Sequence, residues 1–241
     1  MLPRLREAVA DFSMLLTKGY ADKSALKLVG DRFALTQRQR LAVMRSSCSD
    51  QQRQSRLERR MPVEDLAGRP IAIDGYNLLI TIEAALSGGL IFQGRDGCFR
   101  DLASIHGTYR KVEETVPAVR VIGGFLKEIG VAEALWLLDS PVSNSGRLKT
   151  LLAQLARENA WPWEIRLTIS PDAELSSQLT VPSSQFPANC QLTTVNRQLP
   201  VVVVSTDSVV LDACPKWTNL AAEIITQRLP SAPLIETGPS V

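Results

Sequence analysis

The sequence predicts a small all-α region followed by an α/β domain with a mostly parallel sheet. Residues 5–60 contain almost no proline or glycine, and their apolar residues recur at helical spacing. Farther along, short β-rich runs alternate with amphipathic segments, a pattern typical of right-handed βαβ units. The segment MPVEDLAGRP between the two patterns contains the prolines and glycine expected at a boundary. We therefore expect a helical region at residues 1–66, an α/β domain at 67–230 and a flexible tail at 231–241.

The composition is that of a soluble, folded protein. Hydrophobic residues make up 45% of the 241 residues and charged residues 22%, which is ordinary globular usage. The four cysteines are widely separated and lack a CxxC spacing, so neither a zinc knuckle nor a disulfide framework is expected. Charges interrupt the apolar runs of the N-terminus, and no segment reaches the length of a membrane span. We expect a cytoplasmic location and no membrane partner.

The predicted helical region carries an excess of positive charge. Residues 1–69 contain 14 Lys and Arg against 8 Asp and Glu, a net charge of +6, while the remainder contains 13 against 17, a net charge of −4. We expect three or four short helices here, the last at about residues 36–60. Such a basic region favours contact with a phosphate backbone, although a solvated basic helical face explains the charges equally well. On the first interpretation, the residues expected to contact RNA phosphates are Arg53, Arg56, Arg59 and Arg60.

The α/β region divides into alternating elements. Apolar β-rich runs predict strands at residues 71–74, 134–139, 163–169 and 199–207. Segments of helical periodicity predict helices at residues 77–86, 109–129, 145–159, 209–213 and 219–229. Residues 182–196 have weak periodicity and receive no assignment. Strands separated by helices of this length predict a sheet that is covered by helices on both faces.

Three of the predicted strands end in an aspartate. Asp74, Asp139 and Asp207 each close an apolar run, and the carboxyl ends of parallel strands share the edge of the sheet where ligands bind. We expect the three carboxylates to lie close enough to share one ion, and oxygen ligands without Cys or His favour Mg²⁺ or Mn²⁺. The corresponding chemistry is metal-assisted attack of water on a phosphodiester. Each aspartate taken alone also suits a turn or a helix N-cap, and so does Asp172, a candidate fourth ligand.

Three motifs carry a resemblance to a known superfamily. IDGYNLLIT resembles the first strand and helix of the PIN-like and NYN-type ribonucleases, and the later WLLDSPVSNSG and VVVSTDS are similar to their second and last acidic strand ends. A short helical region before such a domain, with GRDGCFRD inside it, resembles a prokaryotic family of unknown function, numbered four-three-four. The resemblance implies a PIN-like, Rossmannoid three-layer domain with Asp74 as the principal metal ligand, completed by Asp139 and Asp207. It also implies that Asn77 braces the first loop or contacts phosphate.

Further polar residues are candidates for the same site. PIN nucleases usually carry another acidic residue on a helix, and Asp172, Asp101 and Glu113 are the candidates for it here. Residues 94–111 are dense in polar side chains and suit a loop over a site. The single histidine is a candidate proton shuttle, although a lone histidine is more often structural. The candidate substrate contacts in this segment are Asp96, Arg100, Asp101 and His106.

A second candidate for phosphate binding is the predicted helix start within SNSGRLK. Backbone amides at a helix N-terminus, followed by cations, can cradle a phosphate group, although an ordinary N-cap explains the motif equally well. The residues in question are Ser143, Asn144 and Arg147.

The sequence therefore leads to a functional expectation with an alternative. We expect a metal-dependent endoribonuclease of the PIN-like class, with RNA as its partner and the basic helical region as a guide. The alternative is a catalytically inactive PIN-like module that binds nucleic acid or protein. A haloacid-dehalogenase-type phosphohydrolase is disfavoured because Tyr76 stands where its second aspartate is needed. A Rossmann cofactor enzyme is also disfavoured, because no strand is followed by GxGxxG. The oligomeric state is left open, with a homodimer among the options.

Overall fold

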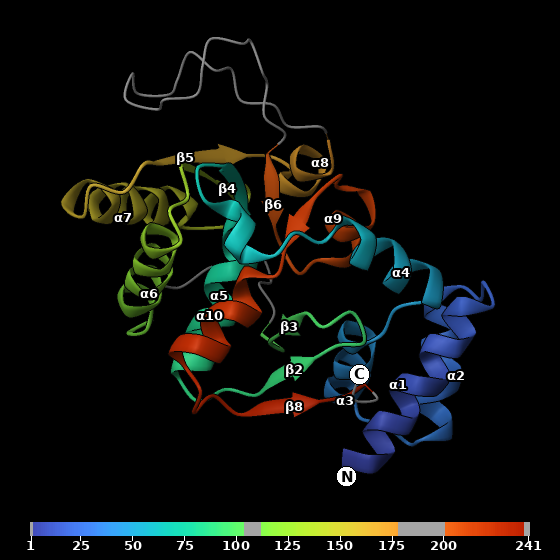
Figure 1. The fold of residues 1–241 in the computed structure, drawn as a ribbon. Helices are drawn as coiled ribbons and strands as arrows, with labels where there is room; N and C mark the ends of the chain where they lie inside the picture. Colours follow the sequence, from blue (N-terminus) through green and yellow to red (C-terminus); the bar gives the residue numbers. More distant parts are fainter. Residues whose placement is uncertain (1, 104–111, 178–200, 239–241) are drawn as a thin grey trace.

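The structure is a computed structural model that describes residues 2–103, 112–177 and 201–238 (Figure 1). Its N-terminal helical region confirms the expected all-α segment and has a small apolar core of its own, which includes Val9, Phe12 and Val29. Within the described residues, no helix has both the length and the apolar character needed to cross a membrane. The helices of this region are α1 (Leu2–Thr17), α2 (Asp22–Arg32), α3 (Gln37–Ser46) and α4 (Asp50–Arg59).

The predicted single helix at residues 36–60 is divided into α3 and α4. Two capping boxes account for the division, because each gives a new helix its own N-terminus. Thr36 accepts a hydrogen bond from the backbone of Gln39, and its own backbone N–H donates to the Gln39 side chain. Ser49 and Gln52 repeat this arrangement at the start of α4. The S/T-x-x-Q spacing was the sequence signal for the break.

The α/β domain is built on a five-stranded sheet in the order β5-β4-β1-β6-β7. All four strand pairs are parallel, which confirms the predicted mostly parallel sheet. Of residues 201–207, the described part of the strand predicted at 199–207, only Val202–Val204 are strand, since residues 205–207 leave the sheet at its carboxyl edge. The strands are β1 (Pro70–Asp74), β4 (Glu133–Asp139), β5 (Trp163–Thr168), β6 (Val202–Val204) and β7 (Trp217–Thr218).

Helices cover both faces of this sheet and make three layers (Figure 1). Side chains alternate between the faces, so Ile71 and Ile73 join the larger apolar core while Ala72 joins the smaller one. The predicted helix at residues 109–129 begins only at Thr115 within the described part of the chain. The larger core is formed with η1 (Val63–Leu66), α5 (Gly75–Leu86), α6 (Thr115–Glu128), α7 (Ser145–Glu158) and α10 (Leu220–Arg228). The smaller core is formed with α8 (Pro171–Ser176) and α9 (Ser208–Ala213).

A second, three-stranded sheet was not predicted from the sequence. It has the order β3-β2-β8, with β2 (Ile91–Gln93) antiparallel to β3 (Phe99–Arg100) and parallel to β8 (Leu234–Glu236). Strand β8 lies in the predicted flexible tail, so that prediction is wrong for these residues, whose backbone is fixed by pairing. Likewise, the predicted loop over a site starts as the turn and second strand of a hairpin. Strands of two or three residues have too few positions to show an alternating pattern.

Ion pairs anchor the helical region to the α/β domain. The Arg56 side chain is 1% exposed and donates through Nη1 to Asp96 Oδ2 at 2.6 Å and through Nε to Asp212 Oδ1 at 2.7 Å. Asp96 also accepts from both terminal nitrogens of Arg100. Burial alone would raise the pKa of Asp96, but the charges of Arg100 and Arg56 outweigh burial and hold that pKa below its usual range.

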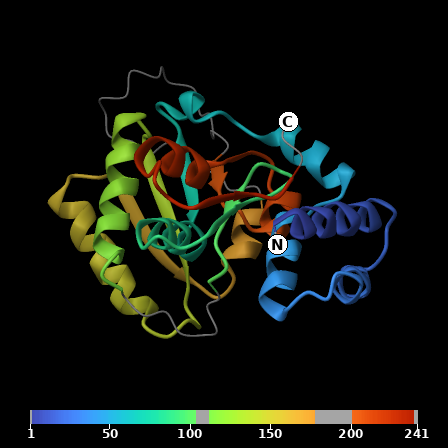
Figure 2. The same ribbon diagram turned by 90° about the horizontal axis from the view of Figure 1, so that it is seen from below.

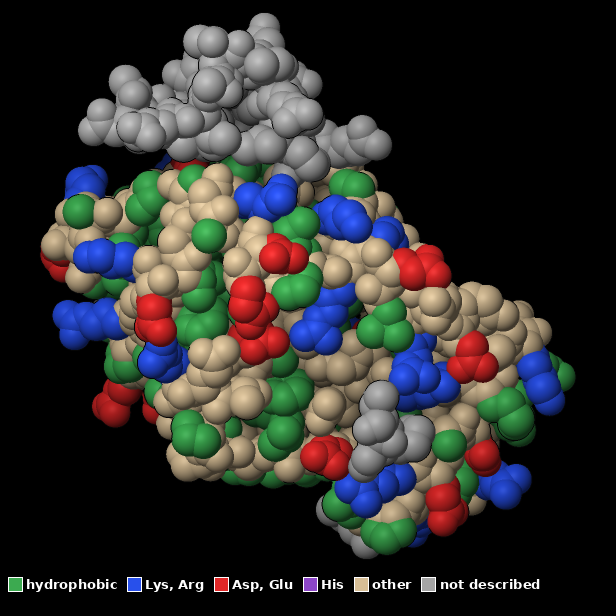
Figure 3. Space-filling view, viewed as in Figure 1, with side chains coloured by type: hydrophobic (Ala, Val, Ile, Leu, Met, Phe, Trp, Pro, Cys, Tyr) green, Lys and Arg blue, Asp and Glu red, His purple; other side chains and the backbone are tan. Residues whose placement is uncertain are grey.

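Three of the four arginines expected to contact RNA phosphates, Arg56, Arg59 and Arg60, make contacts within the chain instead. Arg59 donates to the Cys214 carbonyl, and Arg60 pairs with Glu223 and continues the sheet beside Trp217. The Trp217 indole N–H donates to the Arg56 carbonyl at 2.9 Å. Over the helical region, the face in Figure 3 shows Lys and Arg interspersed with Asp and Glu rather than gathered in one patch. Figure 2 shows the helical region lying beside the α/β domain.

The buried pairs predict a large loss of stability for Asp96→Asn. Removal of this carboxylate leaves two buried guanidinium groups without their shared partner, and we expect a loss of roughly 3–5 kcal/mol in the free energy of unfolding. Urea unfolding at pH 7 measures it. Asp212→Asn is the control, since the Asp212 side chain is 33% exposed and should contribute only about 1 kcal/mol. Equal effects of the two substitutions would show that Asp96 does not anchor the region.

Candidate functional site

The carboxyl edge of the five-stranded sheet contains the point where the strand order reverses. The chain runs from β1 outward to β4 and β5, and then returns to β6 on the other side of β1. In sheets wound in this way, ligands bind in the crevice between the two strands at the reversal. Asp74 ends β1, and residues 205–207 follow β6, so these two segments form the edges of that crevice.

Asp74 is held at this position by a glycine and a serine. A Cβ atom on Gly75 would lie 2.9 Å from the Leu137 carbonyl oxygen, so glycine allows α5 to start close against β4. The Asp74 side chain makes no capping bond to its own helix, and its Oδ2 accepts from Ser205 Oγ at 2.8 Å. Ser205 Oγ in turn accepts from the backbone N–H of Asp207 at 3.0 Å. One hydroxyl thus links the two strand-end aspartates.

Asn77 and Asp207 have well-defined local contacts. Asn77 Oδ1 accepts from both the backbone N–H and the hydroxyl of Thr206, each at 2.9 Å, and so joins α5 to the loop after β6. Asp207 Oδ1 accepts from the N–H groups of Val209 at 2.8 Å and Val210 at 3.4 Å. Asp207 is therefore a helix N-cap as well as a residue of the crevice, and the capping interpretation holds for it.

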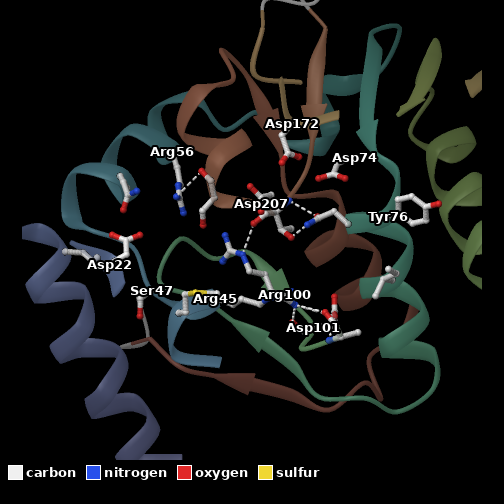
Figure 4. A pocket seen from close by; sticks show the side chains of 18 of the residues that line it. Asp22, Arg45, Ser47, Arg56, Asp74, Tyr76, Arg100, Asp101, Asp172 and Asp207 are labelled. Atoms are coloured by element: carbon white, nitrogen blue, oxygen red, sulfur yellow. Dashed lines mark hydrogen bonds and ion pairs between the residues drawn. The ribbon is translucent and has the colours of Figure 1, made fainter. Parts of the chain in front are cut away.

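A cavity of about 480 Å³ opens at the crevice and is bounded on its far side by the helical region. Figure 4 shows Asp74 and Asp172 along one side and Arg45 and Asp101 along the opposite side. The cavity therefore has an acidic wall from the sheet edge and a wall that contains cations. The residues that line the cavity include Asp74, Asn77, Asp172, Thr206 and Asp207 on the first wall and Leu16, Met44, Arg45, Arg100 and Asp101 on the second.

The acidic wall is electrostatically coupled. Burial raises the pKa of Asp74 to about 7, with the negative charges of Asp172 and Asp207 adding to the effect and the Ser205 hydrogen bond opposing it. Burial, and then the charge of Asp207, raises the pKa of Asp172. Burial and the charge of Asp172 likewise raise the pKa of Asp139. These carboxyl groups repel one another, and a bound cation would relieve that repulsion.

The negative charge and the oxygen donors of the acidic wall fit a hard divalent cation. The side chains do not, however, already surround a position for the ion. Among the residues the structure describes, no group of three or more His, Cys, Asp or Glu is placed to hold a metal ion. The expected sharing of one ion by Asp74, Asp139 and Asp207 is thus not met by their positions here. Asp139 ends β4 at the same edge and does not line the cavity. Mg²⁺, however, usually keeps several waters and binds through one or two carboxylates plus substrate phosphate.

The remaining candidate residues are divided between the cavity and other places. Arg100 and Asp101 line the cavity, and Asp101 Oδ2 accepts from the Thr81 hydroxyl at 2.9 Å. Asp96 lies in the buried ion pairs instead. Glu113 lies outside the cavity lining, and His106 falls outside the described residues. The three candidate phosphate-binding residues before or at the start of α7 are exposed, and none of them lines the cavity. They are Ser143, Asn144 and Arg147.

Several residues of the site were not predicted from the sequence, among them Thr206 and Met44 as well as Ser205 and Arg45. Ser205 could have been noticed from its spacing, since a serine two residues before a strand-end aspartate can cap the turn that carries it. Arg45 had no such signal. It was one of many arginines in a basic stretch, and only the docking of α3 against the hairpin brings it to the cavity.

The fold and the cavity define a class of protein, a doubly wound α/β domain with a carboxylate-lined cavity at its reversal point. The chain belongs to the family described as "Domain of unknown function (DUF5616)", which matches residues 63–223. Residues 4–59 match "Protein of unknown function (DUF434)", the family number expected from the sequence, here confined to the helical region. "Uncharacterized protein MJ0935" of Methanocaldococcus jannaschii is 28% identical over 180 residues, which cover 75% of this chain and 86% of the relative. No solved structure matches the chain.

The raised pKa of Asp74 predicts a pH-dependent effect of Asp74→Asn. Asp74 binds its proton more tightly in the folded state, with a pKa of about 7, than in the unfolded state, where an aspartate has a pKa of about 3.9. Stability of the metal-free protein should therefore fall as pH rises between these two values. Asp74→Asn stays neutral, so it should exceed the wild type by on the order of a few kcal/mol at pH 8 and match it near pH 4.

Urea unfolding between pH 4 and pH 8 in EDTA measures this difference. Asp65→Asn, which removes an exposed carboxylate that does not line the cavity, controls for the change in net charge. Parallel curves for Asp74→Asn and wild type over the whole range would show that Asp74 does not titrate as described.

Proposed function

We propose that this protein is a metal-dependent ribonuclease of the PIN-like class, which hydrolyses RNA phosphodiesters at the cavity beside β1 and β6. One observation carries the proposal: Asp74, Asp172 and Asp207 line the same cavity at the reversal point of a parallel sheet. The mutual repulsion of these carboxylates supports a cationic cofactor. The motif IDGYN and the strand-end aspartates supply the resemblance to PIN-like and NYN-type nucleases.

The residues of the acidic wall would hold Mg²⁺ or Mn²⁺, with Asp74 and Asp207 as the principal ligands and Asp172 nearby. When bound, such an ion lowers the pKa of water and neutralises charge on a phosphate oxygen. Ser205 orients the Asp74 carboxylate and fixes its distance from the Asp207 backbone. Asn77 and Thr206 keep the loop after β6 in position. Arg45 on the opposite wall would attract the phosphate group.

A second candidate function is a binding module of the same class without catalytic activity. The observation that favours it is the lack of a three-residue metal group among the described residues. Such a module would use the cavity to bind nucleic acid or protein and would gain no stability from Mg²⁺ or Mn²⁺.

The nuclease proposal predicts metal-dependent cleavage that Asp74→Asn and Asp207→Asn both abolish. Loss of a metal ligand should lower the rate of cleavage of single-stranded RNA by at least about 100-fold, because metal assistance contributes several kcal/mol to the barrier. Rates are measured with Mg²⁺, with Mn²⁺ and with EDTA. Asp65→Asn is the control and should keep the wild-type rate, and Asp139→Asn should lose less than the cavity variants.

Thermal melting with and without Mn²⁺ separates the two candidate functions. The nuclease should melt at a higher temperature with Mn²⁺, because a ligand that binds only the folded state stabilises it. If the wild type cleaves no RNA with either metal and its melting temperature does not respond to Mn²⁺, the binding module is the correct function.

A further inference from the structure

The cavity is a composite of both regions of the chain. The side chains of Leu16, Met44 and Arg45 come from α1 and α3, whereas the acidic wall comes from the edge of the large sheet. The buried Arg56–Asp96 pair fixes the position of the helical region against this edge. The helical region therefore forms one wall of the cavity and limits the space available to a ligand.

Arg45 differs from the other two arginines that line the cavity. Arg100 donates through Nε to the Thr206 carbonyl and through both terminal nitrogens to Asp96. Arg56 likewise donates through all three of its nitrogens. Arg45 uses only Nη1, which donates to the carbonyls of residues 101 and 103 at 2.7 and 3.0 Å. Within the described part of the chain, Nε and Nη2 of Arg45 have no hydrogen-bond acceptor.

The unused donors of Arg45 are suited to a phosphate group. Its side chain is 30% exposed, and its nearest carboxylate is Asp101 at 3.6 Å, a pair too long for a hydrogen bond. A guanidinium group fixed at one terminal nitrogen presents its other N–H groups as a planar fork, which matches two oxygens of a phosphate. The two backbone carbonyls hold that fork in a defined orientation.

The size and the apolar lining of the cavity suit one nucleotide. A volume of about 480 Å³ lies within the range of small-ligand sites, which is roughly 300–1,000 Å³. Met44 is 44% exposed and precedes Arg45 on α3, and Leu16 and Ile80 also contribute to the lining. Apolar side chains next to a phosphate-binding group provide a surface on which a base can pack.

We infer that the composite cavity binds a single nucleotide that carries a phosphate monoester, with Arg45 on the phosphate and Met44 against the base. The inference rests on the proposed function, since it assigns the substrate class of the same cavity. A monoester carries about −1.5 to −2 charges at neutral pH and so gains more from Arg45 than an internal diester does. The nucleotide is either free or the 5′-phosphorylated end of a strand.

Binding measurements with ligands that resist cleavage test the inference separately from catalysis. The probes are AMP, adenosine and phosphorothioate-linked pentanucleotides with a 5′-phosphate or a 5′-hydroxyl, measured by calorimetry on the full chain with Mg²⁺. We expect each phosphorylated ligand to bind at least about tenfold more tightly than its unphosphorylated partner, as one charge-assisted interaction provides. Tighter binding of AMP indicates a free nucleotide, and tighter binding of the phosphorylated pentanucleotide indicates a strand end.

Variants of α3 assign this preference to Arg45. Arg45→Gln should abolish the preference for phosphate, and Arg45→Lys should keep part of it by retaining charge without the fork. Arg38→Gln is the matched control, because Arg38 is exposed on the same helix and does not line this cavity. Met44→Ala should weaken AMP and adenosine binding to the same degree, which tests the pocket without changing Arg45.

Two results would overturn the inference. One is a wild type without a preference for phosphorylated ligands, and the other is an unchanged preference in a folded Arg45→Gln protein. RNA cleavage together with either result leaves the nuclease proposal intact and removes only this inference. Binding of AMP through Arg45 in a protein that cleaves no RNA removes the nuclease proposal instead.

Discussion

The buried ion pairs between Arg56, Asp96 and Arg100 are the constraint on which the rest of the structure depends. Asp96 lies in the turn of the β2–β3 hairpin, Arg56 lies on α4, and Arg100 also donates to the carbonyl of Thr206 after β6. One carboxylate therefore connects the helical region, the small sheet and the edge of the large sheet. Three buried charges are tolerable only when each is paired, so these elements must be present together.

The site arises from two different uses of aspartate. Asp96 is surrounded by cations, so its charge is stabilised and its role is structural. Asp74 is buried beside other carboxylates, so its charge is destabilised in the metal-free protein. A buried carboxylate whose ionisation is disfavoured lowers the stability of the metal-free fold as pH rises, which is the reason to look for its role in ligand binding.

Prediction from sequence succeeded for helices and strands that show a clear pattern along the chain. It failed for elements that depend on contacts between residues far apart in the sequence. The segments that form β1, β4, β5 and α7 were assigned closely, because each strand is a β-rich, mainly apolar run and the helix contains several turns of helical spacing. The break before α4 was missed although the Ser49 capping box marks it. Strand β8 was missed because it has three residues and pairs with β2, far away in the sequence.

The candidate site shows the same division. Asp74 and Asp207 were found because each follows a recognisable strand, and topology then brings them to one edge. Asp139 was grouped with them by the same rule, but β4 lies on the side of β1 away from the reversal point. The structural role of Arg56 could not be predicted from the sequence. A buried arginine and a solvated one cannot be distinguished there until the ion-pair partner, here Asp96, is known. The pairing of β8 with β2 also bears on synthesis, because the small sheet that carries Arg100 can be completed only after residues 234–236 have left the ribosome, long after β2 and β3 have been made.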